Sequence, residues 1–276
     1  MARRSADEAT TPFLKWAGGK RALLEQIRPH LPRSFGRYYE PFVGSAALFF
    51  STTPRRATLS DTNARLVATF RGLRDATDEV IERLKRCRYN RAQYLTMRAR
   101  DIDREGDAAI AAWFIYLNKT GYNGLYRVNS QNGFNVPFGR YSNPTICDEE
   151  NLRACAASLR TVSILHADFE RATSRARPGD FVYFDPPYVP LSATSSFTSY
   201  TADGFDHDAQ LRLRDHALTL ARRGVHVLVS NSSAKAVVDL YGRDFDLVTL
   251  RARRSINSKG SGRRAIAELL VKSRTF

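Results

Sequence analysis

Four consecutive residues, Asp185-Pro186-Pro187-Tyr188, combine the groups needed to bind a planar amine. They follow the apolar and aromatic run 181–184, whose composition is typical of a buried strand. Ligands of open α/β sheets bind beyond the carboxyl ends of the strands, so we expect Asp185 to face a crevice. Proline has no N–H group, and we expect the carbonyl oxygens of this turn to be free to accept hydrogen bonds. Two acceptors and an aromatic ring together suit the NH2 group of a nucleobase.

The exocyclic amine of adenine is a poor nucleophile because its lone pair is delocalised into the ring. If the Asp185 carboxylate and the Pro186 carbonyl each accept one N–H, the nitrogen becomes more tetrahedral and can attack an electrophile. Tyr188 would stack on the base, which is worth about 1–3 kcal/mol. A base inside a duplex would first have to be flipped out. A structural turn with a helix-capping aspartate is the alternative, and the four residues alone do not decide between the two.

The composition favours a polyanionic partner. The 276 residues include 43 Lys and Arg against 28 Asp and Glu, which gives a net charge of +15. A positive field of this size is typical of proteins that bind nucleic acid. The length fits one enlarged domain, or a catalytic domain with an inserted module.

The three cysteines, Cys87, Cys147 and Cys155, have no C-x-x-C spacing, and the five histidines have no ligand spacing. We therefore expect reduced thiols, no disulfide framework and no metal. The N-terminus is polar and no apolar run is long enough to span a bilayer, so we expect a cytoplasmic protein without a membrane partner.

Strand-like and helical segments alternate along the chain, which predicts an α/β fold with a mostly parallel sheet. Helices are expected over about 62–117 and near 148–158. Strands are expected at 38–43, 57–60, 162–165, 181–184, 225–229, 245–250 and 266–271.

Residues 118–145 interrupt this alternation, because they are rich in glycine, asparagine and aromatic residues. The interruption predicts an inserted recognition domain at 62–145. The catalytic domain would then comprise 12–61 and 146–276, and 1–11 would be a flexible tail.

The first strand leads into Glu40-Pro41-Phe42-Val43-Gly44, where Gly44 would let the backbone approach a ligand closely. Asp61 follows roughly 20 residues later, at the end of the next strand, where an acidic side chain can bind ribose hydroxyls. An ordinary strand–helix turn and a capping aspartate fit the same residues. The segment 15–20 is not a phosphate loop, because Arg21 stands where serine or threonine is needed, and this disfavours a nucleotide triphosphatase.

In their order, these motifs closely resemble those of the Dam-type DNA adenine-N6 methyltransferases, the alpha group or D12 class, which use S-adenosylmethionine. The resemblance extends from about Phe13 to Lys272. It implies an α/β fold: a Rossmann-like S-adenosylmethionine-dependent methyltransferase sheet with an inserted helical and hairpin DNA-recognition domain. The motifs that carry it are 15–20, 40–44, 60–63, 116–125, 134–141, 185–188 and 190–194.

The resemblance also implies roles for single residues of the reaction centre. Asp185 matches the catalytic carboxylate, with Pro186 and Tyr188 beside it. Asp61 matches the acidic residue on the cofactor ribose. The implied cofactor contacts are Trp16, Lys20, Glu40, Phe42, Gly44, Asp61, Asp168, Phe169 and Asp185.

Residues of the inserted module match DNA contacts of the family. Tyr122 matches an aromatic residue that wedges into the DNA where the target adenine leaves. Arg127 matches a guanine reader, in agreement with the frequent bidentate contact of arginine with guanine O6 and N7. Leu125 and Pro137 match contacts with a thymine methyl group. The other implied contacts are Lys15 and Tyr141 with the first base pair, Arg140 with a phosphate, and Asn123. Together these readers imply the target GATC.

The residues themselves support this module in part. Its composition fits a β-ribbon inserted into a groove, although Phe134 and Phe138 fit a small core better. The basic run 251–264 fits either phosphate contacts or a solvated surface. Ser45-Ala46 departs from the family, which usually has a second glycine after Gly44, and we expect this to weaken cofactor binding.

Two alternatives remain: an adenine-N6 methyltransferase that acts on RNA, and a DNA-binding regulator that keeps the fold without the chemistry. The insertion after Asn118 favours DNA, and intact Asp185 and Tyr188 favour catalysis. We therefore expect methyl transfer from S-adenosylmethionine to adenine N6 in double-stranded DNA, by base flipping, at GATC. No obligate protein partner is implied, and DNA binding would place the enzyme at the nucleoid.

Overall fold

The structure, a computed structural model, describes residues 10–190, 205–252 and 266–274. It contains two compact units. Unit 1 consists of Met1–Lys20, Gly44–Thr53 and Asp61–His166, and unit 2 of Arg21–Val43, Pro54–Ser60 and Ala167–Phe276. The functional boundaries expected at residues 61 and 145 stay predictions. No helix in the described ranges is long and apolar enough to cross a membrane.

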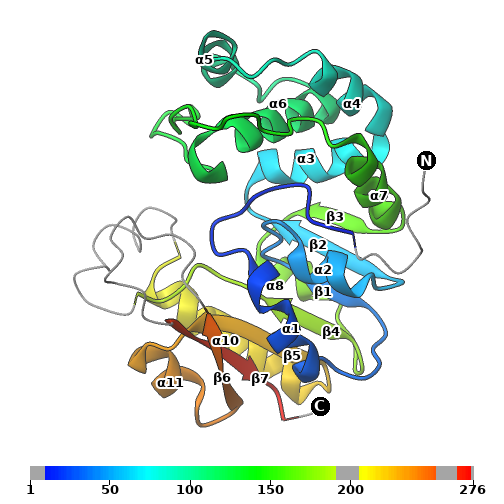
Figure 1. The fold of residues 1–276 in the computed structure, drawn as a ribbon. Coiled ribbons are helices and arrows are strands. Elements are labelled where there is room, and N and C mark those ends of the chain that lie inside the picture. Colours follow the sequence, from blue (N-terminus) through cyan, green and yellow to red (C-terminus); the bar gives the residue numbers. More distant parts are fainter. Residues whose placement is uncertain (1–9, 191–204, 253–265, 275–276) are drawn as a thin grey trace. The chain divides into compact units, whose positions relative to one another are not determined.

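The fold is mixed α/β, as predicted, with a sheet in the order β3-β2-β1-β4-β5-β7-β6 (Figure 1). β1 pairs in parallel with β2 and β4, and β4 with β5, whereas β7 is antiparallel to both β5 and β6. The strands are β1 (Tyr38–Glu40), β2 (Ala57–Asp61), β3 (Ser163–His166), β4 (Phe181–Phe184), β5 (His226–Ser232), β6 (Asp246–Ala252) and β7 (Ile266–Lys272).

Within unit 2, the strand order changes direction between β1 and β4. In open α/β sheets such a switch point lies beside the ligand crevice, at the carboxyl ends of the strands. β1 ends at Glu40, earlier than expected, because Pro41 has no N–H group to continue the pairing. β4 is buried along its whole length, as its uninterrupted apolar sequence predicts, and Asp185 follows directly.

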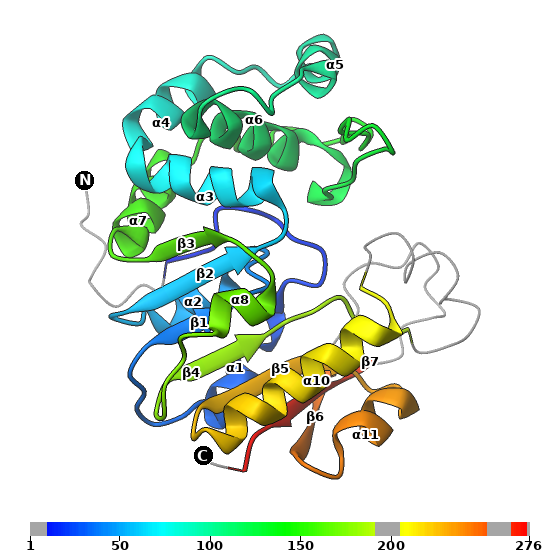
Figure 2. The same ribbon diagram turned by 180° about the vertical axis from the view of Figure 1, so that it is seen from behind.

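The long helix α10 (His207–Arg222) lies across β5 in unit 2 (Figure 2). Asp206 caps it by accepting a hydrogen bond from the backbone N–H of Ala209. Leu213, Ala217 and Leu220 pack in one core cluster with side chains of β4 and β5. The remaining helices of this unit are α1 (Leu24–Ile27), the 3-10 helix η2 (Arg28–His30), α8 (Phe169–Thr173) and α11 (Lys235–Tyr241); η1 (Lys20–Leu23) begins at the end of unit 1.

Unit 1 is built around α6 (Asp107–Thr120), whose side chains are almost all buried. Figure 1 shows it beside α3. α3 (Ala64–Asp75) packs closely on it, since a Cβ at Gly72 would lie 2.2 Å from the Asp107 carbonyl oxygen. The helices expected over about 62–117 are present. The other helices of the unit are α2 (Ala47–Thr52), α4 (Thr77–Lys85), α5 (Arg91–Ala99), η3 (Tyr122–Gly124) and α7 (Glu149–Leu159).

The segment 121–141 in unit 1 contains no strand, so the expected β-ribbon is wrong in form. Only two isolated antiparallel bridges occur in it, Gly121 with Phe138 and Val128 with Phe134. Side chains take over part of the backbone pairing: the Asn129 carboxamide accepts hydrogen bonds from the backbone N–H groups of Gln131 and Gly133. We refer to residues 121–141 as the reader loop.

Candidate functional site

Asp185 lies at the switch point of unit 2, partly exposed at the end of β4. Burial raises the pKa of Tyr183 well above its ordinary value, and the nearby negative charge of Asp185 raises it further. Burial and the same carboxylate also raise the pKa of Tyr188. Asp185 therefore lies near two tyrosine hydroxyl groups and remains accessible, as a substrate-binding carboxylate must.

A buried polar network fixes the turn that follows Asp185. Gln210 is 1% exposed and donates from Nε2 to the Pro187 carbonyl oxygen at 2.9 Å. Asn231, fully buried, donates from Nδ2 to Gln210 Oε1 at 3.1 Å and accepts from the backbone N–H of Val189 at 3.1 Å. The network determines the backbone direction of the turn, and neither Gln210 nor Asn231 was predicted from the sequence.

The two proline carbonyl groups of the turn differ. The expectation that both are free is wrong for Pro187, whose oxygen is bound by Gln210. The Pro186 carbonyl accepts no hydrogen bond from any residue in the described ranges. The Tyr188 hydroxyl donates to Glu268 Oε2 at 2.7 Å, which holds the far end of the side chain in place. A partly exposed carboxylate and a carbonyl group without a partner among the described residues thus occupy adjacent positions in the chain, close to an anchored aromatic side chain.

The other predicted cofactor residues of unit 2 have clear structural partners. Glu40 is buried and accepts a hydrogen bond from the Tyr38 hydroxyl at 2.7 Å. Phe42 and Phe169 stack at 5.8 Å between ring centroids, within an aromatic cluster that includes Phe184. Asp168 caps α8 by accepting from the backbone N–H of Arg171. Each of these residues therefore has a role in the fold, whatever ligand it also contacts.

Two of the predicted cofactor residues of unit 1, Trp16 and Lys20, lie at a tight turn. The backbone N–H of Gly19 donates to the Trp16 carbonyl oxygen at 3.0 Å, and Lys20 is buried with its Nζ 2.5 Å from the Gly18 carbonyl oxygen. A Cβ at Gly44 would lie 2.8 Å from Trp16 Cδ1, so the indole packs where only glycine fits. Gly44 thereby sets the position of the Trp16 ring.

The backbone at Ala46 explains the glycine that the family usually has there. Ala46 has φ 54° and ψ 38°, a left-handed conformation that costs a residue with a Cβ about 1–2 kcal/mol. Asp61, the residue predicted to bind the cofactor ribose, accepts a hydrogen bond from the backbone N–H of Asn63 at 3.0 Å. The acidic side chain thus lies at the start of α3, which Asn63 caps.

Asn118 is a functional candidate that the sequence did not reveal. It is 2% exposed and bonds the Lys15 backbone twice, at N and at O, both at 2.8 Å. Its Nδ2 also donates to the Gly124 carbonyl oxygen at 2.9 Å. A Cβ at Gly124, which has φ +64°, would lie 2.5 Å from Lys15 Cβ. The N-terminal segment and the start of the reader loop are thus held together by one carboxamide.

The reader loop places most of the predicted DNA contacts on the surface. Tyr122 is 52% exposed, and Leu125 and Arg127 are also exposed. Lys15 Nζ lies 4.4 Å from the centroid of the Tyr141 ring, so the two residues predicted at one base pair are neighbours. Asn123, Pro137 and Arg140 are exposed as well.

The aromatic residues of the reader loop fall into two groups, those that pack against other rings and those that are exposed. Phe134 is buried and contacts the rings of Trp113 and Tyr126. Phe138 stacks on Tyr89 at 4.8 Å between centroids. The prediction that these two phenylalanines form a small core is confirmed, in contrast to the exposed Tyr122.

Comparison with known proteins identifies the family. The family model of the D12 class N6 adenine-specific DNA methyltransferases matches residues 16–256. The type II methyltransferase M1.LlaDCHI of Lactococcus lactis subsp. cremoris is 42% identical over 268 residues, which are 94% of this chain and 94% of that protein. The DNA adenine methylase of Escherichia coli strain K12 is 36% identical over 263 residues, again 94% of each chain.

The chain belongs to the D12 class of N6 adenine-specific DNA methyltransferases. The type II methyltransferase M.MjaIII of Methanocaldococcus jannaschii is a further relative, 40% identical over 94% of this chain and 98% of that protein. The methyltransferase is thus an enzyme that modifies adenine in DNA, and the predicted Rossmann-like methyltransferase fold and family are confirmed.

Three predicted features of the methyltransferase fall at least partly on residues outside the described ranges. The first is the tail expected at 1–11, which is described only from residue 10. The basic run 251–264 is described only as far as residue 252, and the motif at 190–194 only at Pro190. The three cysteines are free thiols, as predicted. The residues described contain no group of three or more His, Cys, Asp or Glu side chains that could hold a metal ion.

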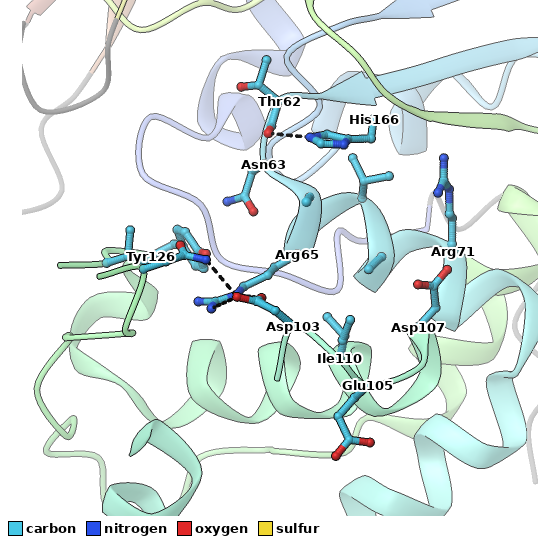
Figure 3. Close-up of a pocket in the computed structure, with 15 residues that line it drawn as sticks. Thr62, Asn63, Arg65, Arg71, Asp103, Glu105, Asp107, Ile110, Tyr126 and His166 are labelled. Atoms are coloured by element: carbon cyan, nitrogen blue, oxygen red, sulfur yellow. Dashed lines mark hydrogen bonds and ion pairs between the residues drawn. The ribbon is translucent and has the colours of Figure 1, made fainter. Parts of the chain in front are cut away.

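The methyltransferase also has a cavity of about 690 Å³ in unit 1 (Figure 3). It is lined by the start of α3 and by Asp103, Ile110, Tyr126 and His166. Arg65, on its wall, forms a bidentate ion pair with Asp103, with N–O distances of 2.6 and 2.8 Å. Neither Asp185 nor Trp16 lines this cavity, whereas Thr62 and Asn63, which directly follow Asp61, do.

Proposed function

We propose that this DNA adenine methyltransferase transfers the methyl group of S-adenosylmethionine to N6 of an adenine flipped out of duplex DNA, within the sequence GATC. The observation that carries the proposal is the pair of neighbouring acceptors after β4. Asp185 is accessible there, and the Pro186 carbonyl accepts no hydrogen bond from the described residues.

Asp185 and Pro186 would each accept one N–H of the adenine amine, so that the nitrogen lone pair points away from both acceptors. This arrangement makes the nitrogen nucleophilic without a metal ion, because preorganised acceptors act more strongly in a site that excludes water. Tyr188 would stack on the flipped base, with the hydroxyl end of its side chain anchored by the hydrogen bond to Glu268. Gln210 and Asn231 hold the turn in place for this geometry.

The residues around Trp16 fit a cofactor that has a flat base, a ribose and a charged amino acid part. Trp16 is partly exposed and packs against the backbone of Gly44, which has no Cβ, and the Asp61 carboxylate suits ribose hydroxyls. We assign cofactor binding to Trp16, Lys20, Gly44 and Asp61 of unit 1. S-adenosylmethionine supplies an electrophilic methyl group on a sulfonium when it is bound. In unit 2 the cofactor residues would be Glu40, Phe42, Asp168, Phe169 and Asp185.

The exposed side chains of the reader loop would select the target sequence. Arg127 would read a guanine, Leu125 and Pro137 a thymine methyl group, and Tyr122 would fill the space left by the adenine. Lys15 and Tyr141 would contact the first base pair, Arg140 a phosphate, and Asn123 the DNA beside Tyr122. The net charge of +15 supports a DNA duplex as the partner and association with the nucleoid, and no obligate protein partner is needed.

Methyl transfer from tritium-labelled S-adenosylmethionine tests the proposal. The substrates are a duplex with one GATC site, the same duplex with GTAC in place of GATC, and an RNA with the first sequence. We expect labelling of the first substrate alone, with no added metal ion. Equal labelling of duplexes that lack GATC would refute the sequence assignment, and labelling of the RNA would support the alternative substrate.

Sequencing of the methylated adenines in DNA from cells that express the chain gives an independent readout. Expression of the Asp185→Ala variant is the matched control for modification by other enzymes. Methylated adenines confined to a sequence other than GATC would replace the proposed target without changing the proposed chemistry.

A further inference from the structure

Tyr126 lies between two proposed base readers but faces the other way. Leu125 and Arg127 are exposed, whereas Tyr126 is partly buried and lines the cavity of unit 1 (Figure 3). A side chain that turns inward between two outward readers fixes the backbone from which both readers extend. The contacts of Tyr126 therefore bear on the geometry of base reading.

One face of Tyr126 belongs to an aromatic stack that includes the proposed cofactor residue Trp16. Tyr126 and Phe114 are nearly parallel, with centroids 5.0 Å apart and an angle of 12°. Trp16 stacks with Tyr126 at 6.2 Å and 20°, and with Phe114 at 6.4 Å and 14°. Because Phe114 is part of the buried helix α6, the stack connects the cofactor segment to the reader loop through a rigid element.

The other side of Tyr126 lies near an ion pair that also holds the tip of the loop. Arg65 is 7% exposed and bonds Asp103 through two nitrogen atoms. Asp103 accepts a further hydrogen bond, at 3.0 Å, from Nδ2 of Asn132 in the reader loop. The hydrogen bond with Asp103 raises the pKa of Arg65, and the nearby Tyr126 hydroxyl contributes to the same effect.

The guanidinium group of Arg127 is held within the same loop. Its Nε donates to Asn135 Oδ1 at 2.7 Å, and its Nη2 to the Asn135 carbonyl oxygen at 3.1 Å. Phe134, next to Asn135, packs against Tyr126 at 5.8 Å. Tyr126 on one arm of the loop and Phe134 on the other thus set where Arg127 points.

We propose that Tyr126 is a positioning residue that couples methyl-donor binding at Trp16 to guanine reading by Arg127. The inference rests on the proposed function. A bound methyl donor restricts the Trp16 ring, and this favours the stacked position of Tyr126 in which Leu125 and Arg127 face the bases. With the donor site empty, the loop also adopts positions that bind DNA without reading it. Coupling between sites is reciprocal, so cognate DNA must tighten donor binding by the same factor.

Equilibrium binding to two duplexes measures this coupling. One duplex contains GATC, and the other carries 7-deazaguanine in place of the GATC guanines, which removes the N7 acceptor that an arginine reads. Dissociation constants are measured with and without S-adenosylhomocysteine, which occupies the donor site without a transferable methyl group. In the unchanged enzyme we expect S-adenosylhomocysteine to increase the preference for GATC at least about fivefold.

Two substitutions of Tyr126 separate positioning from folding. Tyr126→Leu removes the stacked ring, while the variant should still bind both duplexes. S-adenosylhomocysteine should then change its preference for GATC by about onefold, which means no change. Tyr126→Phe keeps the ring and should retain most of the coupling. Asn132→Ala, which releases the loop tip from Asp103, provides a second variant if Tyr126→Leu does not fold; it should reduce the coupling in part.

The outcomes distinguish the inference from the proposed function. Equal weakening of both duplexes by Tyr126→Leu, with the coupling unchanged, would show a purely structural residue and overturn the inference. The same conclusion follows if the unchanged enzyme prefers GATC equally with and without S-adenosylhomocysteine. If it does not distinguish the two duplexes at all, although it methylates GATC, the assignment of Arg127 as guanine reader fails, and the coupling fails with it.

Discussion

The turn 185–189 and the reader loop 121–141 are both irregular segments, yet the protein holds them in different ways. The turn directly follows a buried strand and is fixed by Gln210 and Asn231, which are themselves buried. The reader loop has isolated bridges in place of strands and exposes the side chains that we assign to DNA. It is held by scattered backbone and side-chain hydrogen bonds, such as those from the Tyr122 N–H to the Pro137 carbonyl oxygen and from the Tyr94 hydroxyl to the Val136 carbonyl oxygen.

The difference fits the role that we propose for each segment. Methyl transfer requires two acceptors at fixed positions, and a fully bonded buried network is the stiffest support that polar groups provide. Base reading requires side chains that protrude into a groove, which excludes burial. We therefore expect changes at the turn to affect the rate of chemistry, and changes at the loop to affect the choice of sequence.

Asp185→Ala should have the largest effect. Loss of the carboxylate acceptor should lower kcat by about 10²–10⁴-fold, because the amine nitrogen is no longer held in a reactive geometry. The dissociation constant for GATC duplex and the preference over other sequences should stay within about twofold, since the reader loop is untouched. Single-turnover methylation and fluorescence anisotropy measure the two quantities. Asp185→Asn, which keeps one acceptor oxygen, is the matched control. A large loss of sequence preference in Asp185→Ala would contradict the expectation that the turn affects only the rate of chemistry.

Asn118→Ala should follow, because it leaves three backbone groups of Lys15 and Gly124 without their partner. We expect the free energy of unfolding to fall by about 1–3 kcal/mol for each group that water does not reach. DNA affinity should fall as well, since Lys15 and the start of the reader loop separate. Denaturant unfolding and anisotropy test this. Asn118→Asp removes the two donated bonds but keeps an acceptor for the Lys15 N–H, and should be intermediate; an unchanged DNA affinity in both variants would argue against Asn118 as a clamp.

Gln210→Leu should have a smaller effect than Asn118→Ala. It should lower the rate of methyl transfer and leave DNA binding unchanged. The substitution leaves the Pro187 carbonyl and the Asn231 amide unpaired, which should lower the free energy of unfolding by about 1–3 kcal/mol. kcat should decrease with KM for DNA unchanged, because the turn loosens while the reader loop does not. Steady-state kinetics on two sequences would show this, with Gln210→Glu as the variant that keeps the acceptor for Asn231. A change in relative activity between the sequences would link the turn to base reading.

Arg127→Ala should have the smallest effect and the most local one. We expect about 1–3 kcal/mol less discrimination at one guanine and little change at the other positions of the site. Competition between duplexes that differ at single base pairs measures it. Arg127→Lys keeps the charge but loses the bidentate geometry, so the same discrimination should be lost while the salt dependence persists. A uniform loss over all sequences would identify Arg127 as a backbone contact.

Local patterns predicted the elements well. The run 181–184 is β4, the alternation of strands and helices is the observed α/β fold, and Phe134 is in the core as its aromatic neighbours suggested. The reader loop was predicted as a ribbon and forms isolated bridges, because asparagine side chains compete for the backbone groups that a strand would pair.

The supports of the site were not predictable, because they join residues far apart in the sequence. Asn118 binds Lys15 over 103 positions, and Asn231 binds Val189 over 42. An asparagine or a glutamine in a sequence carries no sign of its partner. The same holds for Gln210, whose bond to the Pro187 carbonyl leaves Pro186 as the acceptor without a described partner.

The sequence by itself determined which chemical groups are present. They are a carboxylate after an apolar strand, a glycine at the segment that we propose to bind the cofactor, and several motifs in the order typical of the protein family. These are local properties of residue type and spacing. Only the tertiary structure decided which acceptors stay available and which readers stay exposed, because burial and hydrogen bonding depend on segments that meet only when the chain folds.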